Sequence, residues 1–199
     1  MNMSKKLFSN CHERGSAGKE RSAGTGAYPT VCEASGHHPP PDPDRGRATN
    51  SKMPSKAALL RRRVKARRSA VQALYQWQLS GKDPRDIFNE FEAERDITQV
   101  DRDYFRTLLR EIPIQVETLE QQLIGVIDRP VNELGPVERA VLWIGIYELM
   151  FCPEIPWRVV LNEAIELTKL FGAEQAHKYV NGVLDKVAHA VRSQEIAAA

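Results

Sequence analysis

Apolar residues recur along most of this chain every three to four positions, which is the period of an amphipathic α-helix. The first such stretch runs from about residue 58 to 80, and Gly81 follows it as a stop signal. Asp83 and Pro84 then supply an N-cap and a first-turn proline for a short second helix. The pattern therefore predicts two helices before residue 100.

A third helical stretch begins near Asp101 and keeps its apolar spacing as far as Ile127. Pro113 falls inside this stretch. It is expected to kink or split the helix, because proline lacks an N–H and its ring clashes with the preceding turn. Residues 128–130 (Asp-Arg-Pro) are expected to end this part of the chain.

The second half of the chain predicts three more helices. A stretch that opens at Pro136 is apolar on nearly every side, so it should lie at the centre of its bundle. Helices at about 157–171 and 174–192 follow, with a glycine cap at Gly172 between them. No alternating strand pattern occurs. The predicted fold is all-α, in two bundle-like halves that meet near residues 128–136.

Residues 1–56 differ in composition from the rest, since they hold six of the 12 glycines and six of the 12 prolines. Such a segment buries too little apolar surface to offset the entropy lost on ordering, so it is expected to be disordered. Met53 resembles a natural start, and residues 1–52 are expected to be a dispensable extension. Residues 57–193 are assigned to one helical domain and residues 194–199 to a disordered tail.

Charge divides the chain into a basic arm and an acidic body. Residues 1–70 carry 15 Lys/Arg and 5 Asp/Glu, or +10, while residues 71–199 carry 13 and 21, or −8. Six cations fall within residues 61–68, and this run continues into an amphipathic helix. One helix end is then held in a core while the other presents arginines, which suits a rigid surface for phosphates. The alternative is a solvated basic helix end without a ligand.

The sequence predicts neither a catalytic site nor a cofactor. Its glycines form no phosphate loop, and Cys11, Cys32 and Cys152 match no metal or redox spacing. Glu163 and Glu166 share a helix face, but an acidic surface is favoured over acid–base chemistry. No apolar run approaches 18 residues and no apolar signal core is present, so we expect a cytoplasmic protein without membrane contact.

A second candidate surface is the helix–Gly–helix junction from Phe171 to Tyr179. Backbone N–H groups that begin the last helix can hold a phosphate, Lys178 would add charge, and either aromatic ring would stack on an unpaired base. The alternative is that both rings belong to the core. Gly182, inside the last helix, is expected to mark a close contact between two helices.

Several motifs of the chain occur in the order found in the NusB family of bacterial transcription antitermination factors. They are Ala70–Leu79, Tyr104–Arg106, Asn162–Leu167, Phe171–Gly172 and Tyr179–Asp185. The chain resembles this family over roughly residues 58–192. The resemblance implies an all-helical fold of two three-helix bundle-like subdomains with a short extra helix, about seven helices in total. It further implies that the protein binds single-stranded boxA-type RNA of ribosomal RNA operons together with the ribosomal small-subunit protein NusE. It also implies that this complex joins RNA polymerase and other Nus factors.

The resemblance also assigns roles to individual residues. It implies an RNA surface formed by Arg61, Arg62, Arg63, Lys65, Arg67, Phe171, Gln175, Lys178 and Tyr179. Tyr75 and Glu138 would lie nearer the protein partner. Position 175 is often an aspartate in the family, so Gln175 removes a negative charge beside the implied RNA path and would raise affinity. Pro113 is a second departure from the family pattern.

Two other functions remain open from the sequence. The same helical domain resembles the N-terminal part of some ribosomal RNA cytosine methyltransferases, which carry a further catalytic domain. The chain is also compatible with a helical scaffold whose basic patch meets an acidic protein. A steep salt dependence of RNA binding would distinguish the RNA-binding function from the scaffold.

Overall fold

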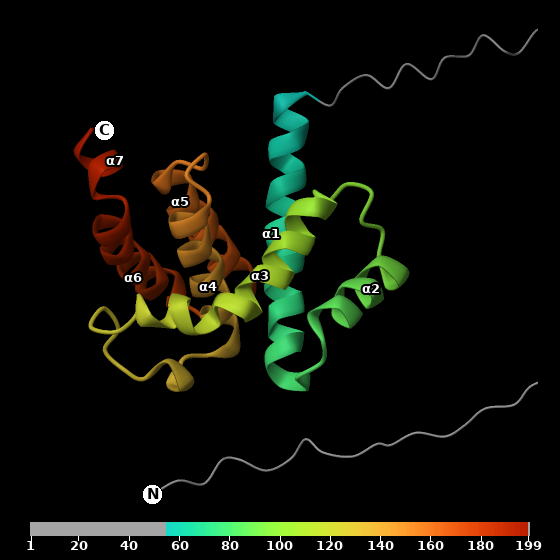
Figure 1. Ribbon diagram of the computed structural model, residues 1–199, viewed down its shortest axis with the longest axis horizontal. Coiled ribbons are helices and arrows are strands. Elements are labelled where there is room, and N and C mark those ends of the chain that lie inside the picture. Colours follow the sequence, from blue (N-terminus) through green and yellow to red (C-terminus); the bar gives the residue numbers. More distant parts are fainter. Residues whose placement is uncertain (1–54, 199) are drawn as a thin grey trace, which may run out of the picture. The chain divides into compact units, whose positions relative to one another are not determined.

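The computed structural model describes residues 55–198, and these residues form seven α-helices and no strand (Figure 1). The helices are α1 (Lys56–Ser80), α2 (Pro84–Glu94), α3 (Arg102–Gln121), α4 (Pro136–Phe151), α5 (Trp157–Phe171), α6 (Ala176–Val191) and α7 (Ser193–Ala197), with a 3₁₀ turn at Val131–Glu133. The prediction of an all-α fold is confirmed. Of residues 1–56, for which disorder was expected, residues 1–54 lie outside the described residues, while Ser55 and Lys56 are the N-cap and first residue of α1. No helix between residues 55 and 198 combines the length and apolar character needed to cross a membrane.

Local chemistry sets the end of α1 and the starts of α2 and α3 as the sequence predicted. Gly81 ends α1 with a φ of 64°, in the left-handed region, and its N–H donates to the Trp77 carbonyl at 2.9 Å. Asp83 caps α2, which begins at Pro84. Asp101 caps α3 by accepting a hydrogen bond from the third N–H of that helix at 3.2 Å.

Helix α3 differs from its predicted form in two ways. It passes through Pro113 without being split, and it ends at Gln121, six residues before Ile127. A series of turns follows, in which Gly125 has a φ of 79°. Leu123 is fully buried within those turns. The apolar spacing beyond Gln121 therefore reflects burial of side chains rather than continuation of the helix.

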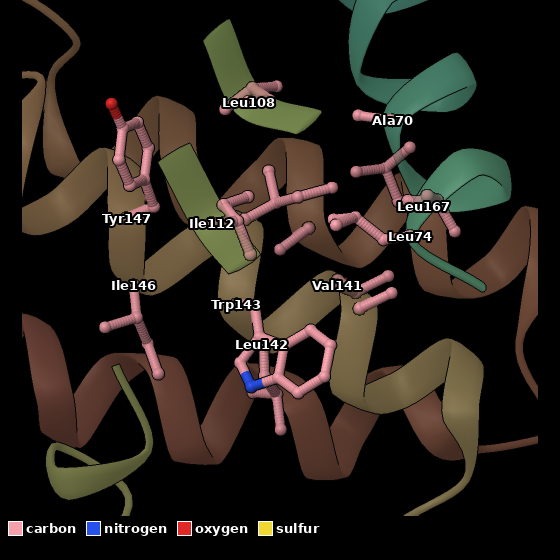
Figure 2. Packing of buried hydrophobic residues seen from close by; sticks show 14 of the residues in the cluster. Ala70, Leu74, Leu108, Ile112, Val141, Leu142, Trp143, Ile146, Tyr147 and Leu167 are labelled. Atoms are coloured by element: carbon pink, nitrogen blue, oxygen red, sulfur yellow. The ribbon is translucent and has the colours of Figure 1, made fainter. Parts of the chain in front are cut away.

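One apolar core joins the two predicted halves. Helices α1, α2 and α3 pack together, as do α4, α5 and α6, and α1 and α3 also pack against α4. Figure 2 shows side chains from four helices meeting at this core, among them Leu74, Ile112, Val141 and Leu167. Helix α4 is buried on all sides from Ala140 to Leu149, as its apolar sequence predicted.

The packing corrects the prediction for Gly182, whereas the predicted glycine cap at Gly172 is confirmed. A Cβ atom at Gly182 would meet no atom within 4 Å, so this exposed glycine marks no helix contact. The close approach lies at Gly145 instead, where a Cβ would come within 2.8 Å of a Leu184 methyl group. Gly172 does end α5, but its φ is −86° rather than left-handed. A side chain is excluded there because a Cβ would lie 2.8 Å from the Thr168 carbonyl oxygen.

The predicted disordered tail at 194–199 instead contains α7. Arg192, whose side chain is only 10% exposed, donates to the carbonyl groups of Leu149 at 2.6 Å and Cys152 at 2.9 Å, at the end of α4. Glu195 pairs with Arg192 at 2.8 Å and accepts the backbone N–H of Trp157 at 3.1 Å. The tail is ordered because one ion pair satisfies backbone groups at the end of α4 and the start of α5.

Replacement of Arg192 by alanine is expected to lower the free energy of unfolding by about 2–4 kcal/mol, because it leaves partly buried carbonyl groups without donors. Urea denaturation followed by circular dichroism at 222 nm measures the change. Lys169→Ala is the control, since Lys169 forms an exposed pair with Glu166 and its loss should change stability by less than about 1 kcal/mol. Equal stability of the two variants would contradict a structural role for Arg192.

Candidate nucleic-acid interface

An exposed row of side chains runs along the whole of α1. At spacings of three or four residues it contains Arg61, Lys65, Arg68, Gln72, Tyr75 and Leu79, of which only Gln72 is half-buried. The first three place cations on a face that turns toward solvent. Arg68 was not among the expected RNA contacts, although its helical spacing from Arg61 and Lys65 could have identified it. The row presents charge at one end and the Tyr75 ring, 41% exposed, further along.

Arg62 and Arg63 lie at the edge of this row and are half-buried. One guanidinium N–H of Arg62 donates to the Thr98 carbonyl at 2.9 Å. Arg63 lies 3.5 Å from the Asp101 carboxylate, and its guanidinium carbon is 4.7 Å from the centre of the Tyr104 ring. Both arginines thus fasten α1 to the segment between α2 and α3, and they offer less of their charge to a ligand than Arg61 and Lys65.

Arg67 is a correction to the expected RNA surface, because it lies inside the protein at 4% exposure. Its Nε donates to Glu148 Oε1 at 2.7 Å, and its Nη2 donates to Glu148 Oε2 at 3.2 Å. The Tyr104 hydroxyl donates to the same Oε1, and Glu163 lies 3.5 Å from Nη1. The Arg67 charge is therefore used within the core and is not available to RNA.

The protonation states of this buried cluster follow from its geometry. Burial raises the pKa of Tyr104, and the adjacent Glu148 carboxylate raises it further, so the phenol keeps its proton. Burial alone would lower the pKa of Arg67, but the ion pair and hydrogen bonds with Glu148 outweigh this effect and raise it. The cluster consequently holds one fixed cation and a hydroxyl donor around one carboxylate.

Helix α5 links the cationic row to the second candidate surface. On this helix Glu163 forms an ion pair with Arg67 at 3.5 Å, and Glu166 pairs with Lys169 at 2.7 Å. Lys169 lowers the pKa of the Glu166 carboxyl, and Arg68 and the start of α6 at His177 lie near enough to lower it further. Each glutamate is thus paired with its own cation, Glu163 with a buried arginine and Glu166 with an exposed lysine.

The α5–α6 junction presents its predicted residues unequally. Gln175 and Lys178 are exposed, and Gln175 adopts a φ of 66°, in the left-handed region. Phe171 and Tyr179 are half-buried and pack against the core. The Tyr179 hydroxyl donates to Asp128 at 3.2 Å, and the guanidinium carbon of Arg129 is 5.4 Å from the centre of its ring. Much of the Tyr179 ring is therefore already in contact with the protein.

A groove of about 640 Å³ brings residues of both candidate surfaces together. Its lining includes Tyr75 and Leu79 of α1, Phe91 of α2, Val137 of α4 and Phe171 of α5. The next residue of α4, Glu138, accepts the backbone N–H of Ala173 at 3.4 Å. The two residues implied as partner contacts, Tyr75 and Glu138, thus border the same α5–α6 junction that was implied to bind RNA. No group of acidic, His and Cys residues between 55 and 198 is arranged to hold a metal ion.

Comparison with known proteins assigns this helical arrangement to a family. The sequence model of the NusB family matches residues 64–189, which is more than half of the chain. The chain belongs to the NusB family. It is 56% identical over 134 residues to the transcription antitermination protein NusB of Nitrosococcus oceani, an alignment that covers 67% of this chain and 90% of that relative.

Solved NusB structures share the fold. A crystal structure of the antitermination factors NusB and NusE in complex with double-stranded RNA gives a TM-score of 0.59 at 30% identity, covering 64% of this chain and 96% of that chain. T. maritima NusB gives a TM-score of 0.59 at 28% identity, covering 67% and 96%. The family contains antitermination factors rather than enzymes, in agreement with the absence of a catalytic motif from the sequence.

Arg67 and Arg68 are adjacent on α1, but Arg67 is buried and Arg68 is exposed, so substitutions at these two residues distinguish a structural role from a binding role. Arg67→Met should destabilise the protein by about 3–5 kcal/mol, because it leaves the Glu148 carboxylate buried without its cation. Arg68→Met makes the same substitution at an exposed position and should change stability by less than about 0.5 kcal/mol. Urea denaturation of both variants checks this difference. A stable Arg67→Met protein would show that the buried pair does not hold the helices together.

Proposed function

We propose that this protein is a transcription antitermination factor that binds boxA-type RNA of ribosomal RNA operons together with the ribosomal protein NusE. With other Nus factors the complex would join RNA polymerase, a role carried out in the cytoplasm. The observation that carries this proposal is the exposed cationic row of α1, which includes Arg61, Lys65 and Arg68 on a helix fixed in the core. Supporting evidence comes from relatives named as antitermination proteins and from a neighbour solved with NusE and RNA.

The site divides into two parts with different chemistry. Arg61, Lys65 and Arg68 span about 10 Å along α1 at 1.5 Å per residue, so they would contact a short length of phosphate backbone. The groove beside Tyr75 is largely apolar and ends near the Glu138 carboxylate. Such a groove suits a protein surface with apolar side chains and a cation, and it is the part we assign to NusE.

The half-buried aromatic residues limit how RNA would be held at the junction. Because Phe171 and Tyr179 pack against the core, only their exposed edges are open to a base. Lys178 and the backbone at the start of α6 are more accessible, and no side chain of the described residues caps that helix start. We therefore infer that the junction contributes mainly charge and backbone N–H groups, with limited stacking.

The double variant Lys65→Ala/Arg68→Ala should bind a short boxA RNA more weakly, because two phosphate contacts are lost. The slope of log K against log salt should become less negative by about 1.4 for a single strand. Fluorescence anisotropy over a salt series, with single- and double-stranded boxA RNA, measures both effects. The control Lys82→Ala/Arg102→Ala removes the same charge from two exposed residues that pair with Glu90 and Glu92 of α2. Equal loss in both double variants would show nonspecific charge attraction, and no loss in the first would remove the row from the RNA site.

Gln175→Asp should weaken RNA binding by a few-fold, since it places a carboxylate at an exposed position beside the proposed RNA path and costs about 1 kcal/mol. The effect should shrink as salt is raised. Gln175→Asn provides the neutral control of the same shape, and both residues tolerate the left-handed backbone of this position. Tighter binding by Gln175→Asp than by Gln175→Asn would contradict the charge argument.

A further inference from the structure

A second pocket lies between α2 and α3, on helices that do not contribute to the cationic row of α1. Its volume is about 360 Å³, and Figure 1 shows α2 on the side of α1 away from α5 and α6. Pro84, Phe88 and Leu109 provide its apolar lining, and Phe88 and Leu109 are core residues. Three arginines, Arg85, Arg106 and Arg110, complete the lining with Asn89. The pocket thus combines an apolar floor with a cationic rim.

The three arginines differ in the use of their charge. Arg85 pairs with Asp83 at 2.8 Å, and Arg110 pairs with Glu111 at 2.6 Å. The Arg106 side chain makes neither an ion pair nor a hydrogen bond with any residue between 55 and 198. Its guanidinium carbon lies 4.7 Å from the centre of the Phe88 ring, so this cation is placed against the pocket floor. Stacking on the ring leaves guanidinium N–H groups available to an acceptor.

We propose that this pocket binds a peptide segment of a partner protein in which a large apolar side chain stands next to an acidic one. The apolar side chain would occupy the space above Phe88 and Leu109, and the carboxylate would accept hydrogen bonds from Arg106. A planar carboxylate matches the two-pronged geometry of a guanidinium group. The surface lies apart from the proposed RNA-binding row, so both ligands can bind at once.

The rim favours a peptide over RNA. A phosphate chain that follows the rim would pass the carboxylates of Asp83 and Glu111, which repel successive negative charges. The floor is apolar and suits an apolar side chain better than the polar edge of a base. A short peptide can place one carboxylate at Arg106 and an apolar side chain on the floor without following the rim past Asp83 and Glu111.

The test uses the full chain and the fluorescein-labelled peptide Ser-Glu-Leu-Phe-Glu-Ser with blocked ends. We expect binding with a Kd on the order of 100 μM, as for a small interface, and NMR shifts at Phe88, Arg106 and Leu109. Arg106→Gln should weaken binding roughly tenfold by removing the charge-assisted hydrogen bonds. Arg102→Gln, one turn earlier on α3 and paired with Glu92, is the matched control and should leave the affinity within about twofold.

Three results would overturn the proposal. Equal binding by wild type and Arg106→Gln would show that the cation does not contribute to binding. Equal binding of a peptide with Gln in place of both Glu would show the same for the carboxylate. NMR shifts at these pocket residues with single-stranded RNA but not with the peptide would assign the pocket to nucleic acid. Arg106→Gln should leave boxA RNA affinity unchanged, so failure here is distinguishable from failure of the proposed RNA surface.

Discussion

The fold depends on one carboxylate in the last turn of α4. Glu148 is 1% exposed and accepts hydrogen bonds from Arg67 of α1 and Tyr104 of α3, while its backbone carbonyl accepts one from Arg192 at 3.1 Å. Arg67 in turn reaches Glu163 of α5. A buried charge is tolerated only when it is paired and fully hydrogen-bonded. These side chains must therefore all be in place together, and the network fixes how four helices and the C-terminal segment are arranged.

The binding surface follows from this buried pair. A helix turns once in 3.6 residues, so once Arg67 points into the core the rotation of α1 is set. Arg61, Lys65 and Arg68 then lie about 100° or more around the helix from Arg67 and face solvent, and the same row continues to Tyr75. Arg62 and Arg63 hold the start of the helix against the α2–α3 segment. The cationic row is thus rigid because neighbouring arginines of the same run serve as structural residues.

Local patterns predicted the helices well because apolar period, caps and prolines are properties of short stretches. The long-range pairings could not be predicted in this way. Six cations look alike in sequence, and what buries Arg67 is a glutamate 81 positions away. The order of α7 likewise depends on carbonyl groups some 40 residues before Arg192. The prediction of a helix contact at Gly182 was wrong for the same reason, since only the packed structure shows that the close contact lies at Gly145.

The groove beside α1 connects the two proposed ligands physically. Tyr75 and Phe171 line the same space, and Glu138 holds the Ala173 N–H at the junction that leads to Gln175 and Lys178. A protein that fills the groove would contact Phe171 and favour the arrangement of the junction seen here. Binding of the protein partner would then favour binding of RNA at the junction. Because such coupling is reciprocal, RNA bound at the junction would tighten binding of the partner by the same factor.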